Sequence, residues 1–220
     1  YTMLEISKDQ MTKMSVNVLL AFKVQLKDHI REYYPIQSAP LDDECLFTLI
    51  DDCLETAQDL SISEQAAIQS FVDHCILLGK DFHQNPLYFE LCRPLYDSDI
   101  NDNIYRLDKL YDSAWAYLEV IRGQDASKLF LAVSRLKSWL QSAKALQYNS
   151  LNLQEILSAF QLVYPEKYEA HSQKLHIDFI KQTVKRANAD DFLQPASQLA
   201  YVLMAFIAGI GFYRDQLYIG

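Results

Sequence analysis

Five acidic residues recur within a short stretch of the sequence at spacings that could form one charged surface. They are Glu44, Asp51, Asp52, Glu55 and Asp59. Residues three, four and seven positions apart lie on the same side of an α-helix, so a helix here would place these carboxylates along one stripe. A row of exposed carboxylates attracts the Lys and Arg side chains of a protein partner. We therefore expect this acidic stripe to bind a partner, and the alternative is an ordinary solvated helix face.

The sequence has none of the short motifs that mark common catalytic or nucleotide-binding sites. It lacks HExxH, GxSxG, a Walker loop and GxGxxG. None of the five histidines stands at metal-ligand spacing from a second His or a Cys on one helix face: His29, His74, His83, His171 and His176. We therefore predict no catalytic residue, no metal site and no cofactor, and we expect the chain not to be an enzyme. An enzyme with a dispersed carboxylate site is the alternative.

One segment partly resembles the calcium-binding loop of an EF-hand. From Asp97 to Asp108, oxygen-bearing side chains stand at loop positions 1, 3, 5 and 12. However, Asp102 occupies the position where the loop needs Gly, and Asp108 is shorter than the usual bidentate Glu. We therefore expect Asp99 or Asn101 to cap a helix here, where negative charge near the N-terminus is favourable.

The overall charge of the chain favours one class of binding partner, a basic protein, over nucleic acid. The formal net charge is −9 and the pI is near 5.0. Non-specific affinity for nucleic acid comes from Lys and Arg side chains that displace counterions from the phosphates. We therefore expect a basic protein partner and no nucleic acid.

The cysteines and the first residues of the sequence indicate the cellular compartment of the protein. The four cysteines lie in apolar stretches and not in CxxC pairs, which is typical of reduced and mostly buried thiols: Cys45, Cys53, Cys75 and Cys92. The sequence does not open on a basic segment followed by an apolar one, as a signal peptide would. The sequence therefore predicts a cytoplasmic protein.

Hydrophobic periodicity predicts the elements that must position these residues, and all of them are helices. The expected ranges are about 8–34, 43–58, 63–79, 101–121, 125–146, 152–164, 172–188 and 195–210. Pro35 ends the first helix, and Gly79 is a natural C-cap for the third. Half of the residues are hydrophobic and only five are Gly. We therefore predict a compact all-α protein of about eight helices.

An internal repeat appears when each residue is compared with the one 130 positions later. The matches include Tyr34-Pro35 with Tyr164-Pro165, Gly79 with Gly209, Phe82 with Phe212, and Leu87-Tyr88 with Leu217-Tyr218. Self-similarity at a fixed offset indicates duplicated structure. We predict that residues 22–88 and 152–218 form two similar three-helix units joined by two linking helices. The expected parts are 1–121, a connecting helix at 122–150, and 151–220, packed as one globular body.

The repeat leads to two further predictions. Residues 199–213 carry no charge, but their counterpart 69–83 contains Asp73 and Lys80, and a membrane span needs about 20 apolar residues. We therefore expect a buried core helix and no membrane span. Phe82 and Phe212 each follow a Gly cap, and we expect both rings to be buried.

The two repeats differ in charge on the same helix face. The positions equivalent to Glu44, Asp51 and Glu55 are occupied by Lys174, Lys181 and Lys185. Solubility alone would not require either sign, so the inversion indicates separate electrostatic roles for the two faces. The alternative is that the two stripes face each other, within the fold or across a dimer.

The first unit also contains an ordered set of caps and core positions. The set comprises Ile6-Ser7-Lys8-Asp9-Gln10-Met11, Phe22 to Tyr34-Pro35, Phe71-Val72-Asp73, Leu78-Gly79-Lys80-Asp81-Phe82, Pro86, and Arg106-Leu107-Asp108-Lys109-Leu110. Over residues 4–121 this order resembles a helical family encoded beside type VI secretion system effectors, and residues 153–218 repeat it more loosely. A similar module lies at the C-terminal end of some effector adaptor proteins.

This resemblance implies a function but transfers no catalytic residue, because its motifs are structural. It implies a cytoplasmic bacterial protein that binds a secreted effector. We expect an immunity protein that neutralises a cognate toxin by direct binding. The alternative is a chaperone or adaptor that escorts the effector for loading, and a homo-oligomer is compatible with either role.

Overall fold

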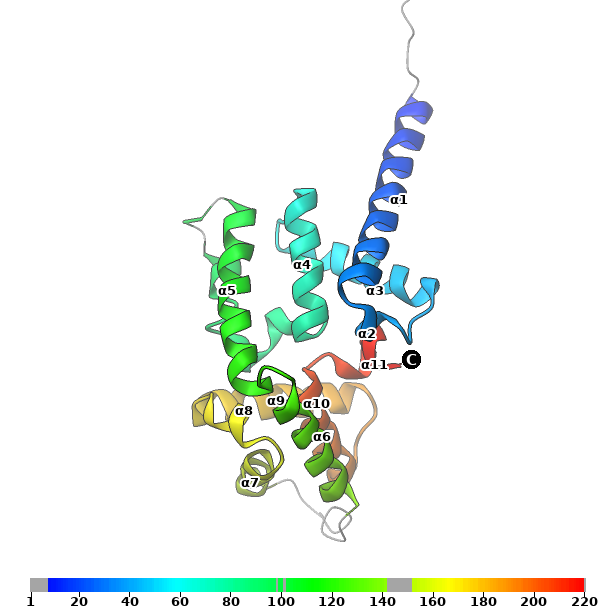
Figure 1. Ribbon diagram of the computed structural model, residues 1–220. Coiled ribbons are helices and arrows are strands. Elements are labelled where there is room, and N and C mark those ends of the chain that lie inside the picture. Colours follow the sequence, from blue (N-terminus) through cyan, green and yellow to red (C-terminus); the bar gives the residue numbers. More distant parts are fainter. Residues whose placement is uncertain (1–7, 98, 101, 142–151, 220) are drawn as a thin grey trace, which may run out of the picture. The chain divides into compact units, whose positions relative to one another are not determined.

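The computed structural model describes residues 8–97, 99–100, 102–141 and 152–219, and every regular element in these ranges is helical (Figure 1). This confirms the predicted all-α class. The eight longer helices are α1 (Lys8–Tyr33), α3 (Asp43–Asp59), α4 (Gln65–Leu78), α5 (Asn103–Arg122), α6 (Ser127–Leu140), α7 (Leu153–Val163), α9 (Gln173–Ala189) and α10 (Pro195–Ala208). Each corresponds to one predicted helix; the expected end of the fifth, near residue 146, lies outside the described residues.

Shorter elements fill the connections. Three are single helical turns, α2 (Pro35–Ser38), α8 (Pro165–Glu169) and α11 (Gln216–Ile219). Four are 3₁₀ turns, η1 (Phe82–Gln84), η2 (Pro86–Tyr88), η3 (Arg93–Tyr96) and η4 (Phe212–Arg214). Three of these 3₁₀ turns occupy the stretch after Gly79 for which the sequence shows no periodicity.

The chain divides into two compact units. Unit 1 comprises Tyr1–Asp73 and Asp215–Gly220, and unit 2 comprises His74–Arg214. The boundary between them falls inside α4. The predicted division into 1–121, 122–150 and 151–220 follows the repeat instead, and it stays a prediction.

Unit 1 is built on the packing of α1 against α3. The C-terminal half of α1 buries Leu26 and Ile30, which are 1% and 0% exposed. The facing side of α3 buries a row of apolar residues with helical spacing: Leu46, Leu49, Ile50, Cys53 and Ala57. Removal of this apolar area from water stabilises the unit and fixes the opposite face of α3 toward solvent.

Unit 2 has an aromatic core where α7, α9 and α10 meet. The Phe160 and Phe206 rings stack with centroids 3.9 Å apart, and Phe179 meets each of them edge-on at about 6 Å. Tyr164 donates a hydrogen bond from its hydroxyl to the Ile121 carbonyl at 3.0 Å, which satisfies a buried polar group. In the described part of the chain, no helix is long and apolar enough to cross a membrane, and α10 packs into this core as predicted.

The backbone repeats with the predicted register of 130. α3 and α9 begin and end 130 residues apart, as do α4 and α10. Ser61 and Asp191 both adopt positive φ, at 59° and 65°, and Gly79 and Gly209 follow at 95° and 106°. A Cβ at position 209 would lie 3.3 Å from the Leu78 carbonyl oxygen, so glycine suits the position for both conformation and space.

The final turn of each repeat packs on a helix of the other repeat. Within unit 2, η2 of the first repeat packs against α9 of the second. Within unit 1, α11 of the second repeat packs against α3 of the first. Both turns start in the same way, because Asn85 and Asp215 each accept a hydrogen bond from the amide two residues ahead.

Two local predictions need correction. Phe82 is 1% exposed as expected, but Phe212 is only half-buried. The Phe82 ring lies 6.1 Å from the His74 ring and 5.8 Å from the His83 ring, whereas Phe212 lies beside the buried Tyr201 ring, at 4.9 Å, and the exposed Tyr213. The N-cap of α5 is Asp102, which accepts a hydrogen bond from the Tyr105 amide at 3.1 Å.

Candidate partner-binding site

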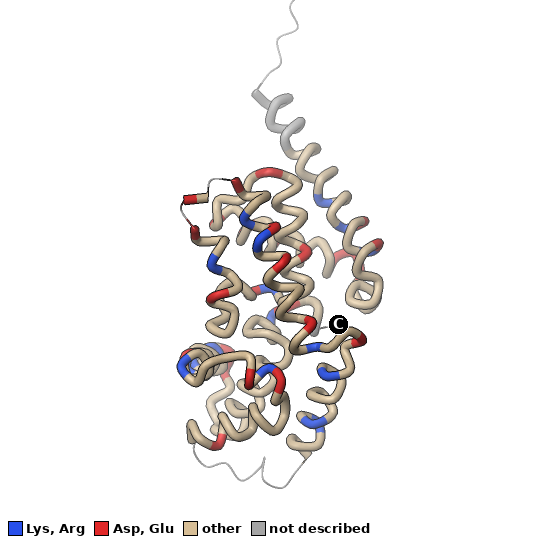
Figure 2. Tube along the Cα trace, turned by 60° about the vertical axis from the view of Figure 1, so that its left-hand side comes forward, with Lys and Arg blue, Asp and Glu red and all other residues tan. Residues whose placement is uncertain are grey.

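The acidic stripe lies on α3, on the side opposite its buried face. α3 starts after the N-cap Asp42, whose carboxylate accepts a hydrogen bond from the Cys45 amide at 2.8 Å. Four members of the stripe are exposed and Asp52 is half-buried; the exposed ones are Glu44, Asp51, Glu55 and Asp59. Figure 2 marks the acidic and basic positions along the chain.

The five carboxylates fall into two rows. At about 100° per residue, Glu44, Asp51 and Glu55 lie within about 40° of one another around the helix axis. Asp52 and Asp59 lie roughly 60° to 80° further round the helix. The stripe therefore has an inner row that faces the side of α1 and an outer row that faces away from it.

Basic side chains of α1 pair with one edge of α3. Lys23 forms an ion pair with Asp51, and Lys27 donates a hydrogen bond to Asp43 at 2.7 Å. This hydrogen bond and the nearby Arg31 guanidinium lower the pKa of Asp43. Exposed ion pairs contribute at most about 1 kcal/mol each, so they position α1 more than they stabilise it.

An apolar groove runs between α1, α3 and the start of α4 in unit 1; we call it the α1–α3–α4 groove. It has two continuous lobes of about 630 and about 430 Å³. Both lobes are lined by Leu19, Leu54, Ser63 and Ile68. Asp51 and Glu55, from the inner row of the stripe, form part of the lining of the larger lobe. The sequence did not indicate this groove, because it depends on how α1 and α4 flank α3.

The equivalent face of α9 carries the opposite charge in the structure as in the sequence. Lys174, Lys181 and Lys185 are exposed, and no ion pair of the described residues includes them. The pairing of the two stripes with each other stays a prediction.

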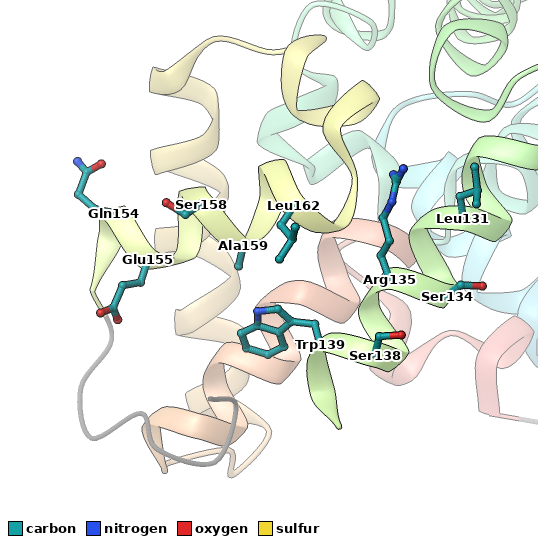
Figure 3. A pocket seen from close by; sticks show the side chains of 10 residues that line it. All are labelled: Leu131, Ser134, Arg135, Ser138, Trp139, Gln154, Glu155, Ser158, Ala159 and Leu162. Atoms are coloured by element: carbon teal, nitrogen blue, oxygen red, sulfur yellow. The ribbon is translucent and has the colours of Figure 1, made fainter. Parts of the chain in front are cut away.

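A second groove lies in unit 2 between α6 and α7 (Figure 3). Its volume is about 740 Å³, and its apolar lining includes Leu131, Trp139 and Leu162. Arg135 and Glu155 also line it and balance each other in charge. This groove offers apolar area but no charge bias that would select one kind of partner.

A buried lysine in unit 2 is the chemically least expected group of the structure. Lys167 is 1% exposed, and its Nζ donates a hydrogen bond to the Tyr88 hydroxyl at 3.3 Å. The ammonium also lies 5.5 Å from the centroid of the Phe206 ring. Burial, with a smaller effect of Arg122, lowers the pKa of Lys167 to about 7. A substrate cannot reach this amine, so the geometry does not support a catalytic lysine.

Lys167 lies beside two histidines that are also held neutral. His171 Nε2 and the Tyr117 hydroxyl are 2.9 Å apart. Burial lowers the pKa of His171 to about 3, and nearby Lys167 and His176 add to this effect. Burial likewise lowers the pKa of His176, whose Nε2 lies 2.9 Å from the Tyr168 carbonyl oxygen. Sequence reasoning missed this cluster because the residues that it contacts, Tyr88, Tyr117 and Phe206, come from distant parts of the chain.

His29 is satisfied structurally in unit 1. Its Nε2 lies 2.8 Å from Asp73 Oδ1, and its Nδ1 lies 3.3 Å from Gln69 Nε2. Both ring nitrogens therefore have hydrogen-bond partners within unit 1.

Among the described residues, the histidines, the cysteines and the calcium-like segment do not form a metal site. The described residues contain no group of three or more His, Cys, Asp or Glu side chains able to hold a metal ion. In the calcium-like segment, Asp97 accepts a hydrogen bond from the Asp99 amide at 3.0 Å, while Ser98 and Asn101 lie outside the described residues. All four cysteines are free thiols, and only Cys45 is not fully buried.

Comparisons of the chain with protein-family models, curated proteins and solved structures give no match. The functional conclusion therefore depends on the geometry of the site and on the resemblance carried by the sequence.

Proposed function

We propose that this chain is a non-catalytic protein that binds a secreted effector of a bacterial type VI secretion system. The observation that carries the proposal is the acidic stripe on α3. In the described part of the chain, no ion pair includes Glu44, Glu55 or Asp59, and all three are exposed. Such unpaired carboxylates speed the approach of a basic surface.

We further propose that the chain acts as an immunity protein, which neutralises its toxin in the cytoplasm by direct binding. A chaperone or adaptor that escorts the effector would use the same kind of surface. The two roles differ in what binding does to the toxin. Co-expression of chain and effector should restore growth if the chain is an immunity protein, and should leave toxicity unchanged if it only escorts the effector.

The test of the stripe is the association rate with the effector encoded by the neighbouring gene. The double variant Glu44→Lys with Glu55→Lys is preferred over a change at Asp51, because reversal of Asp51 would also break its ion pair with Lys23. We expect an association rate several-fold lower at low salt, a smaller difference at high salt, and an unchanged dissociation rate.

The matched control is Asp108→Lys with Asp112→Lys on α5, which changes the net charge by the same amount. Both residues are exposed and four positions apart. The control variant should associate at nearly the wild-type rate, and a thermal melt should show both variants folded. Equal slowing by both pairs would mean that only the net charge matters and would contradict the stripe as docking surface.

A further inference from the structure

The α1–α3–α4 groove has the length of a short helical contact. Along α3 its lining runs from Asp51 to Gln58, which is about 10 Å at 1.5 Å per residue. Apolar side chains at positions i, i+3 or i+4, and i+7 of an amphipathic helix span the same distance. The groove can therefore take two turns of a helix laid along α3.

The apolar surface of α1 extends beyond what unit 1 covers. Leu19 lines both lobes of the groove yet is 48% exposed. Val16, within one turn of it, is 59% exposed. Apolar side chains gathered at the surface beside a groove are typical of a binding surface. The groove and this flank of α1 together offer apolar contact area on one side of the acidic row.

The charge on the groove is one-sided. Glu55 lines the larger lobe without an ion-pair partner among the described residues, one helical turn beyond Asp51. Among the described residues of the lining, the only cation is Lys23, which already pairs with Asp51. A helix in the groove would therefore meet an unpaired carboxylate along its α3 edge. A Lys or Arg on that edge is favoured there, and an acidic residue is repelled.

We propose that the α1–α3–α4 groove binds one amphipathic helix of the effector, with apolar residues in the groove and basic residues along the edge that meets Glu55. This inference rests on the proposed function and adds the form of the partner. It predicts that recognition needs both the apolar lining and the inner acidic row. The outer row, at Asp52 and Asp59, contributes only long-range attraction.

The second repeat has a different arrangement at the equivalent positions. The counterparts of Gln58 and Ile68 are Asn188 and Gln198, and Gln198 donates a hydrogen bond to Asn188 at 2.5 Å. The counterparts of Asp51 and Glu55 are the exposed Lys181 and Lys185. This hydrogen-bonded polar pair replaces the apolar lining, and the neighbouring lysines would repel a basic helix. We therefore assign the binding of an amphipathic helix to the first repeat alone.

The first experiment needs no effector. The probe is a synthetic 18-residue helical peptide with Leu at i, i+3, i+4 and i+7 and Lys beside them, measured by fluorescence anisotropy with the full chain. Leu19→Glu should weaken binding by about tenfold or more, because it places a charge in the apolar lining. Leu20→Glu is the matched control: Leu20 is 55% exposed on the same helix but lines neither lobe. It should bind the peptide like the wild type.

A peptide with Glu in place of Lys tests the charge of the edge, and it should bind at least about tenfold more weakly than the Lys peptide. Equal affinity of the two peptides, or equal effects of the Leu19 and Leu20 variants, would overturn the groove proposal.

Light scattering tests whether a second copy of the chain occupies the groove instead. A concentration-dependent dimer that Leu19→Glu abolishes would identify a second copy as the occupant and would also overturn the proposal. Circular dichroism and a thermal melt confirm that each variant is folded.

The second experiment separates this inference from the proposed function. Binding of the neighbouring effector is measured for Leu19→Glu, Leu20→Glu, Glu55→Lys and Asp59→Lys. The groove proposal expects large losses only for Leu19→Glu and Glu55→Lys. If Glu55→Lys and Asp59→Lys slow association equally while Leu19→Glu has no effect, the stripe binds the effector without the groove. If the wild-type chain does not bind the effector at all, the proposed function fails, whatever the peptide shows.

Discussion

Gln37 and Lys167 occupy equivalent positions in the two repeats, yet Gln37 is exposed and Lys167 is 1% exposed. The tyrosines that precede them differ in the same way, because Tyr34 is half-buried and Tyr164 is buried. The backbone around both pairs is the same, with a Tyr N-cap and a Pro at the first position of a short helix. The repeat thus fixes the backbone, while the surroundings of each copy decide which side chains are buried.

The two repeats also use their surfaces differently. In unit 1 the face of α3 is acidic and borders an apolar groove, whereas the same face of α9 in unit 2 is basic. At the positions of unit 2 that correspond to the groove, polar side chains hydrogen-bond to each other, as Gln198 does to Asn188. Under the proposed function, the first repeat supplies the binding surface.

The largest expected effect separates the two phenylalanines that follow the Gly caps. Phe82→Ala should lower the free energy of unfolding by about 3–5 kcal/mol, as for other large-to-small changes at buried positions. Phe212→Ala should cost clearly less, because its ring is only half-buried. Urea unfolding of both variants measures the difference. Equal losses would show that the two repeats bury this position alike in solution.

The second prediction concerns the pH dependence that Lys167 introduces. Its pKa is about 7 in the folded chain and 10.5 in the unfolded chain, so the unfolded chain binds more protons between these pH values. Lys167 therefore contributes a rise in the free energy of unfolding with pH in this window, of roughly 2–3 kcal/mol between pH 7 and pH 9. The cysteine thiols oppose this rise, because they ionise in the unfolded chain with a pKa of about 8.5 while burial raises the pKa of Cys92 in the folded chain to about 12. The effect of Lys167 is therefore the difference between the wild type and a variant that lacks it.

Lys167→Met should remove this rise, because methionine fills the apolar site without a titratable group. The nearby cation Arg122 stays charged throughout, and His171 and His176 stay neutral, because burial lowers the pKa of both rings. Lys181→Met, at an exposed position of α9, is the control and should follow the wild-type curve. Chemical unfolding of the wild type and the two variants at several pH values measures these free energies of unfolding. Parallel curves for the wild type and Lys167→Met from pH 7 to pH 9 would contradict a neutral buried lysine.

The smallest effect should be the same in both repeats. Ser61 and Asp191 adopt φ near 60°, a conformation that costs most non-glycine residues about 1–2 kcal/mol. Ser61→Gly and Asp191→Gly should therefore each raise the free energy of unfolding, by up to about 1 kcal/mol once the greater freedom of unfolded glycine is counted. Thermal melts of the two variants should shift upward together. A gain in only one repeat would show that the two turns are not equivalent in energy.

Most of the helical pattern follows from local sequence signals. Apolar periodicity and capping residues such as Asn152 and Ser172 locate the long helices to within a few residues. The short helices α2 and α8 were missed because Pro35 and Pro165 were interpreted as stops. Proline also suits the first turn of a helix, where its missing amide hydrogen is not needed.

The candidate site could be predicted only in part. The spacing of the five carboxylates places the stripe on the solvent side of α3, as the structure shows. The ion pair between Lys23 and Asp51 depends on which side of α3 is covered by α1, and no local pattern encodes that choice. Lys167 was missed for the same reason, since its contacts Tyr88 and Phe206 come from distant parts of the chain.

The packing of α11 on α3 affects the order in which a nascent chain can complete its structure. Synthesis runs from the N-terminus, so α1 and α3 leave the ribosome long before α11. Unit 2 already has η2 and α9 at that stage and can close its core first. Unit 1 must keep part of α3 uncovered until residues 215–219 have been made. Unit 1 therefore cannot reach its complete structure before the last residue of unit 2 has been made, although most of unit 1 is synthesised first.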